Sequence, residues 1–124
     1  MSVKKTSDSD KSLYELIYIA KPELVDSAIE EYNKKITDVI TNVGGKVSKV
    51  ENWGVRSLAY KVNKYKKGIY CLLHIEAEPK FQDDIKYMFK VDDNLLRFLL
   101  IKVDELDAEP SKIMSYNKSE YERS

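Results

Sequence analysis

The chain has 124 residues, the usual length of one domain, and 43% of them are hydrophobic, enough to form a core. Its 21 basic and 21 acidic residues balance, and no apolar run approaches the roughly 18 residues that cross a bilayer, which argues against a membrane protein. The single cysteine, Cys71, cannot form an internal disulfide, and the polar residues 1–12 lack the apolar region of a secretory signal. We therefore expect a cytoplasmic protein.

Hydrophobic periodicity predicts six elements in the order strand, helix, strand, strand, helix, strand. The first strand ends at Lys21-Pro22, and the helix after it ends at Gly44-Gly45, which are expected to supply left-handed residues. The long second strand loses its alternation near Gly54, where we expect a bulge. A polar turn at 63–68 leads to a dense apolar strand, and residues 92–94 separate the second helix from the last strand. The predicted ranges are 13–20, 23–43, 46–62, 69–77, 79–91 and 95–103.

This order predicts an α+β fold of the ferredoxin-like split β-α-β (βαββαβ) type, in which a four-stranded antiparallel sheet carries two helices on one face. The other face would be an open docking surface, although the fold alone does not indicate for what. We assign residues 13–105 to this domain. Residues 1–12 are expected to form a polar extension, and residues 106–124 a polar tail that is mobile or ordered by a partner.

Positive charge is concentrated in residues 46–67, which contain seven basic residues and one acidic residue. The flanking segments 13–45 and 68–105 each carry a net charge of −3, so the neutral total hides a polarised molecule. The basic segment also contains aromatic residues, among them the only tryptophan, Trp53. Such interleaving is typical of a nucleic-acid binder, although a solvated basic hairpin would have the same composition.

Arg56 is the strongest candidate for an RNA contact, because its planar, charged group lies beside the expected bulge, which would aim it outward. Trp53 and Tyr60 are instead expected to pack in the core, since large aromatic side chains usually serve burial. Four lysines that follow Arg56 are candidate phosphate contacts as a group: Lys61, Lys64, Lys66 and Lys67.

The residues offer little for catalysis. His74 is the only histidine and lies in an apolar strand, which indicates a structural role, and one histidine with one cysteine cannot form the usual zinc site. The paired carboxylates Asp83-Asp84 and Asp92-Asp93 suit a helix start and a turn. An acylphosphatase of this fold would need an arginine in the loop after the first strand, where the chain has Ala20-Lys21-Pro22-Glu23. We expect no catalytic residue, metal, cofactor or small-molecule substrate.

The RNA-recognition motif is the RNA-binding alternative on this fold, and it stacks bases on aromatic residues of the two central strands. The stacking positions here would be Ile69, Cys71 and His74, which are poor platforms, and Tyr18 would stack alone. RNA binding is therefore expected to depend on basic edges and loops that contact phosphates and recognise the shape of the RNA.

Several short motifs occur in a fixed order along residues 12–104. They are Tyr14-Glu15, Gly44-Gly45-Lys46-Val47, Glu51-Asn52-Trp53-Gly54-Val55-Arg56-Ser57-Leu58-Ala59-Tyr60, Lys66-Lys67-Gly68-Ile69-Tyr70, Ile75-Glu76-Ala77, and Asp93-Asn94 followed by Arg97. With these motifs the chain resembles the family of bacterial-type small-subunit ribosomal protein S six. The Trp-Gly-x-Arg-x-Leu-Ala-Tyr core is the most specific of them.

The resemblance implies a structural component of the small ribosomal subunit that binds the central domain of small-subunit ribosomal RNA and pairs with ribosomal protein S eighteen. The family also has basic residues near Lys90 and Arg97, which makes them candidates for contacts with RNA or the partner. Ser57 stands where the family usually has a second basic residue, which weakens the phosphate contact expected there, and Lys61 stands where it usually has a proline. The alternative is a protein-interaction module of ferredoxin-like fold without direct RNA binding, and salt-dependent RNA affinity would separate the two.

Overall fold

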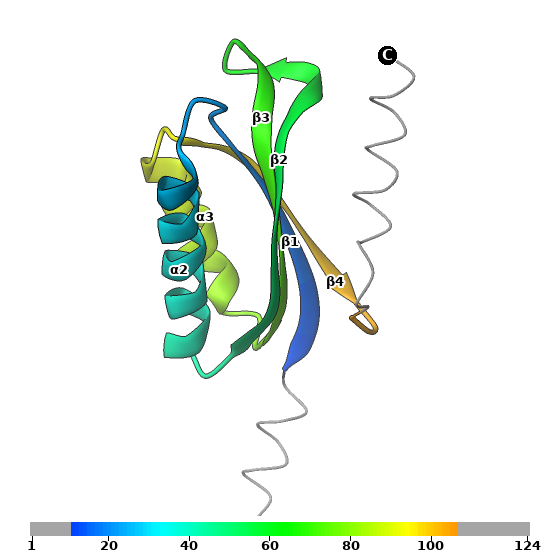
Figure 1. Ribbon diagram of the computed structural model, residues 1–124. Coiled ribbons are helices and arrows are strands. Elements are labelled where there is room, and N and C mark those ends of the chain that lie inside the picture. The colour runs from blue at the N-terminus through cyan, green and yellow to red at the C-terminus, as the bar shows by residue number, and fades with distance from the viewer. Residues whose placement is uncertain (1–10, 107–124) are drawn as a thin grey trace, which may run out of the picture.

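The computed structural model describes residues 11–106, and their elements follow the predicted order. The elements are β1 (Ser12–Ala20), α2 (Asp26–Asn42), β2 (Lys46–Val62), β3 (Tyr65–Ala77), α3 (Phe81–Val91) and β4 (Leu95–Val103). The strands form one antiparallel sheet in the order β2-β3-β1-β4. Figure 1 shows α2 and α3 on one face of this sheet, while no described element covers the other face. The predicted ferredoxin-like fold is confirmed.

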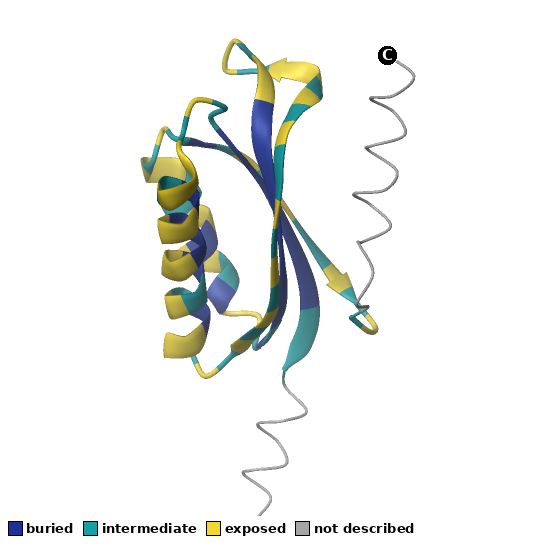
Figure 2. Cartoon of the chain, viewed as in Figure 1, coloured by how far each residue is buried: buried dark blue, intermediate teal, exposed yellow. Residues whose placement is uncertain are grey.

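The core lies between the sheet and the two helices. Because alternate residues of a strand point to opposite faces, β1 directs Tyr14, Leu16 and Tyr18 toward the helices, and Ile17 and Ile19 toward the open face. Figure 2 shows buried residues where the helices meet the sheet and exposed residues on the outer surfaces of the helices. The helices contribute residues spaced by three or four positions, namely Ile29, Tyr32, Ile36, Ile40, Phe81 and Ile85.

The helix α2 begins at Asp26 rather than at residue 23, because the chain makes a turn first. The N–H of Lys21 donates to the carbonyl oxygen of Asn94 (3.0 Å), and the N–H of Leu24 donates to that of Lys21 (3.3 Å). The first bond ties the end of β1 to the start of β4, and the second closes a turn that precedes the first residue of α2.

The end of α2 corrects one prediction about its two glycines. Gly44 is left-handed as expected (φ 84°), but Gly45 is not. A Cβ atom at Gly45 would lie 2.7 Å from the Cβ of Ala77 and 2.8 Å from the carbonyl oxygen of Glu76. Glycine is needed there because the chain passes very close to the end of β3.

The turn between β2 and β3 is shorter than the predicted 63–68. It consists of Asn63 and Lys64, whose positive φ angles of 50° and 74° are those that a two-residue type I′ turn requires. The strand β3 already begins at Tyr65, so Lys66 and Lys67 belong to a strand and not to a loop.

The terminal predictions lie almost wholly outside the described residues. Of the polar extension predicted at 1–12, the structure describes only its last two residues, and Ser12 opens β1. Of the tail predicted at 106–124, it describes only residue 106.

A hydrogen-bonded cluster joins α2 to the sheet inside the core. The Tyr18 hydroxyl donates to Oδ1 of Asn33 (2.5 Å), and Nδ2 of Asn33 lies 4.0 Å from Sγ of Cys71. Burial raises the pKa of the Tyr18 hydroxyl far above its usual range, so Tyr18 stays a neutral donor.

We expect Tyr18→Phe to lower the free energy of unfolding by about 1–3 kcal/mol, because Asn33 would lose its buried partner. Urea denaturation measures the change. Tyr87→Phe on the exposed side of α3 is the control, with an expected change within about 0.5 kcal/mol. An effect as small as the control's would contradict the prediction.

Candidate nucleic-acid interface

The sheet topology gathers basic residues at one end of the molecule. Because β1 runs antiparallel to β3 and β4, and β2 antiparallel to β3, the ends of β1 and β2 meet the starts of β3 and β4. The helix α3 also ends there, as Figure 1 shows. Six of the seven predicted RNA-binding residues lie at this end, and all six are exposed. We call it the basic end, defined by Lys61, Lys64, Lys66, Lys67, Lys90 and Arg97.

The β2–β3 hairpin carries most of this charge. Its tip projects beyond the two helices in Figure 1. Lys64 occupies the turn itself, and Lys66 and Lys67 are consecutive residues of β3, so their side chains leave opposite faces of the hairpin. The hairpin therefore presents positive charge on both of its faces.

Lys21, which the sequence analysis did not select, also lies at the basic end. Its Nζ is 5.8 Å from the ring centroid of Tyr65 on the hairpin. Lys21 and Lys90 both line a shallow groove that connects the hairpin turn to the α3–β4 turn. From the sequence, the pair Lys21-Pro22 is interpreted as a strand end and as part of a loop without the arginine of an acylphosphatase, although the predicted topology already places that loop beside the hairpin.

The acidic residues at this end are partly engaged within the fold. Asp92 accepts a hydrogen bond from the Tyr32 hydroxyl (2.6 Å) through Oδ2 and one from the N–H of Asn94 (3.0 Å) through Oδ1. Nδ2 of Asn94 donates in turn to the Tyr32 hydroxyl (3.0 Å). Burial and the hydrogen bond to Asp92 raise the pKa of the Tyr32 hydroxyl. This network fixes the α3–β4 turn beside Lys90.

Arg56, the seventh predicted residue, lies apart from the basic end, in the middle of β2. The bulge predicted near Gly54 is present: Gly54 is left-handed (φ 78°), and the pairing with β3 shifts between Asn52 and Gly54. Arg56 is half-buried rather than fully outward, and its Cζ lies 5.2 Å from the ring centroid of Trp53. The guanidinium is thus held against an indole.

The open face of the sheet carries a second apolar cluster. Ile17, Ile19, Tyr70 and Leu72 are buried there, and Trp53, Leu58 and Leu96 pack against them while remaining partly exposed. Trp53 therefore packs as predicted only in part: it stays partly exposed, and it packs against this second cluster and not in the main core.

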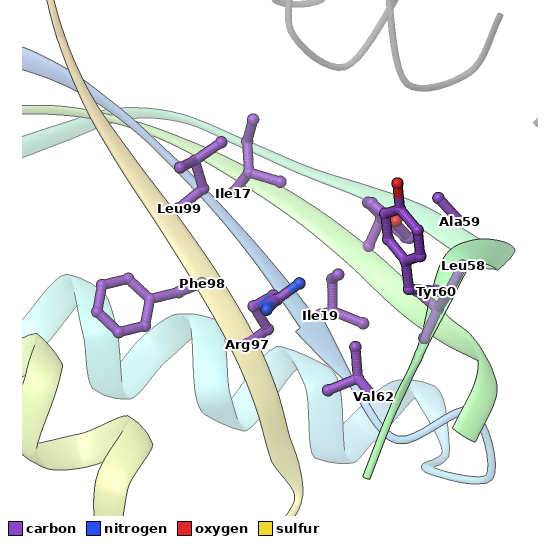
Figure 3. Close-up of a pocket in the computed structure, with 10 residues that line it drawn as sticks. Ile17, Ile19, Leu58, Ala59, Tyr60, Val62, Arg97, Phe98 and Leu99 are labelled. Atoms are coloured by element: carbon purple, nitrogen blue, oxygen red, sulfur yellow. The ribbon is translucent and has the colours of Figure 1, made fainter. Parts of the chain in front are cut away.

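A cavity of about 330 Å³ opens on this same face. Figure 3 shows Ile17, Ile19, Leu58, Tyr60, Arg97 and Leu99 around it, whereas Phe98 points away. The prediction that Tyr60 packs in the core is wrong, because Tyr60 is 80% exposed at the rim near the end of β2. Arg97, which belongs to the basic end, also borders this apolar surface.

The remaining chemistry is sparse. His74 is buried on the sheet, with Nε2 3.3 Å from Oε2 of Glu15, and Nε2 makes no hydrogen bond to any described residue. Within residues 11–106, no three His, Cys, Asp or Glu side chains are grouped so that they could hold a metal ion. In the same part of the chain, no helix has the length and apolar character that a membrane span requires. Burial raises the pKa of the Cys71 thiol, which makes that thiol a poor nucleophile.

Comparison with known proteins gives consistent matches. A family model described as "Ribosomal protein S6" matches residues 13–102. The small ribosomal subunit protein bS6 of Bradyrhizobium sp. is 36% identical over 111 residues, covering 90% of this chain and 72% of that protein. The bS6 protein of Nitrobacter hamburgensis is 37% identical over 111 residues, covering 90% and 76%. The crystal structure of 30S ribosomal protein S6 from Thermotoga maritima matches in fold with a TM-score of 0.69, at 19% identity, covering 91% of this chain and 97% of that one.

Proposed function

We propose that this chain, which belongs to the ribosomal protein S6 family, binds small-subunit ribosomal RNA through its basic end and does so together with ribosomal protein S eighteen. Family membership makes it a structural component of the small ribosomal subunit in the cytoplasm, and not an enzyme. RNA binding is supported above all by one observation, the gathering of six exposed basic residues from four elements and the hairpin turn at one end of the sheet.

The arrangement of charge favours contacts to phosphates over the reading of bases. Ile69 and Cys71, two positions at which the RNA-recognition motif stacks bases, are buried beneath the helices. The third, His74, is also buried. The exposed lysines of the hairpin are instead suited to contacts with the phosphates of an RNA backbone, which release counterions.

The apolar open face supports the second half of the proposal. Leu99 is 46% exposed beside the cavity, and Trp53, Leu58 and Leu96 keep part of their surface accessible. Burying this surface against ribosomal protein S eighteen would remove apolar area from water at a place that adjoins Arg97. This exposed apolar surface also favours the alternative, a protein-interaction module without direct RNA contact.

Titration of the full chain against RNA of the small-subunit central domain separates these functions. We expect the logarithm of the association constant to fall linearly with the logarithm of salt concentration, because phosphate contacts release counterions. The control is the same titration with duplex DNA of equal length and charge, which tests preference for the RNA shape. Co-sedimentation with small subunits in the absence of any salt-dependent RNA affinity would favour the protein-interaction module.

A further inference from the structure

We infer that Trp53 is a positioning residue for Arg56: its indole, fixed by Glu51, holds the guanidinium ready for a phosphate before RNA arrives. The inference rests on the proposed function and extends it, because it adds Arg56, which lies outside the basic end, as a further phosphate contact. It concerns residues in the middle of β2, away from the basic end.

Alternation along β2 puts Glu51 and Trp53 on the same face, and the bulge at residues 52–54 brings Arg56, three residues after Trp53, to that face as well. Oδ1 of Asn52 accepts a hydrogen bond from the N–H of Gly54 (2.8 Å), which stabilises the left-handed conformation at Gly54. Nε1 of Trp53 then donates to Oε1 of Glu51 (2.8 Å). The other carboxylate oxygen of Glu51, Oε2, lies 3.0 Å from Nζ of Lys49. The Glu51 carboxylate therefore holds the indole at its N–H edge, and Lys49 in turn holds the carboxylate.

Glu51 remains ionised in this arrangement. Burial would raise the pKa of its carboxyl, but hydrogen bonds from Trp53 and Lys49 outweigh burial and the pKa is lowered. An ionised carboxylate is the stronger acceptor for the indole N–H, so the anchor is present throughout the neutral range.

Arg56 is placed against this fixed indole by its neighbours. The residue paired with Arg56 across the hairpin is Gly68, which has no side chain to compete for the space. Glycine is required at that position, since a Cβ would lie 2.3 Å from Cγ2 of Ile19. Nε of Arg56 is buried and makes no hydrogen bond to any described residue.

Preorganisation is what makes the stack useful for binding. A free arginine loses rotamer freedom when it engages a phosphate, whereas a guanidinium already stacked on an indole has lost much of it beforehand. A planar guanidinium held at a defined angle can also donate two parallel hydrogen bonds to one phosphate. Trp53 therefore acts on RNA affinity through Arg56.

The test is a double-mutant cycle of Trp53→Leu and Arg56→Ala, read as RNA affinity and salt slope. Arg56→Ala should flatten the log–log salt slope by about one unit. Trp53→Leu should weaken binding by about two- to tenfold with the slope unchanged, because the charge stays and only its ordering is lost. The double variant should bind no more weakly than Arg56→Ala. Losses that add would mean that Trp53 acts independently of Arg56, and would overturn the inference.

A second variant covers the case in which Trp53→Leu perturbs folding. Glu51→Leu removes a negative charge, so simple electrostatics predicts tighter RNA binding. If Glu51 acts by positioning Trp53, the variant should instead bind RNA several-fold more weakly. The fluorescence of Trp53, the only tryptophan, should change as well. Tyr87→Leu on α3 is the matched aromatic control and should leave RNA affinity unchanged. Tighter binding by Glu51→Leu would overturn the inference.

These experiments also separate the two proposals. Normal RNA binding by Arg56→Ala, with loss of binding in variants of the hairpin lysines, would overturn this inference and leave the proposed function standing. An absence of salt-dependent binding by the unmodified chain would overturn both.

Discussion

Replacing Lys64, Lys66 and Lys67 together by alanine should weaken RNA binding by about a hundredfold at physiological salt, if each lysine contacts one phosphate. The size follows from counterion release: each lost contact flattens the log–log salt slope by about 0.7–0.9, and three contacts together by about two to three units. Affinity measured across a series of salt concentrations gives both quantities. The fold should survive, because all three side chains are exposed and none belongs to the core.

A matched control separates the position of the charge from its amount. Lys34, Lys35 and Lys86 are also exposed lysines, but they lie on the two helices. Their replacement by alanine changes the net charge by the same amount and should leave the salt slope almost unchanged. An equal loss in both triple variants would show that net charge alone drives binding, and an unchanged slope in the hairpin variant would remove the hairpin from the interface.

The order of elements was predictable because it depends on local periodicity. The dense apolar run that became β3, the apolar stripe of α3, and the break of alternation at Gly54 are visible in the sequence within a few residues. The turn between β2 and β3 was predicted at the right place but too long, because Asn63 and Lys64 lack the glycine that usually marks a two-residue turn. Propensity does not reveal that Lys64 adopts a left-handed conformation there.

Features that depend on distant residues were not predictable. Gly45 needs to be glycine because of Ala77, which lies far along the chain, and no local pattern carries that information. Tyr60 was expected in the core on its size alone, yet it lies where β2 extends past the helices. Lys21 joined the basic end only through the three-dimensional adjacency of the ends of β1 and the hairpin. The sequence located the charge, whereas the topology determined its neighbours.

Ribosomal protein S eighteen should raise the RNA affinity of this chain by about 5–150-fold, the usual range of coupling between two binding sites. Outside the basic end the chain offers RNA little attraction, because residues 13–105 contain 15 basic and 15 acidic residues. A few phosphate contacts on their own give affinities on the order of micromolar or weaker. A partner docked on the open face would lie beside Arg97 and could extend the positive surface with groups that this chain lacks.

The open face also supplies a variant that tests the coupling without touching the lysines. Leu99→Asn places a neutral polar group beside the cavity, at a side chain that is already 46% exposed. It should leave RNA binding by the chain alone unchanged, and it should remove most of the gain that the partner brings. Reduced binding in the absence of the partner would place Leu99 in the RNA interface and would argue against a separate protein-docking face.

The gain must also be reciprocal, because coupling between two ligands of one protein is a single free energy. RNA should therefore tighten the pairing of the two proteins by the same factor by which the partner tightens RNA binding. Two titrations at one fixed salt concentration measure this: RNA into the chain with and without ribosomal protein S eighteen, and the partner into the chain with and without RNA. Tight, specific RNA binding by the chain alone, unchanged by the partner, would contradict the coupling and would describe an autonomous RNA reader.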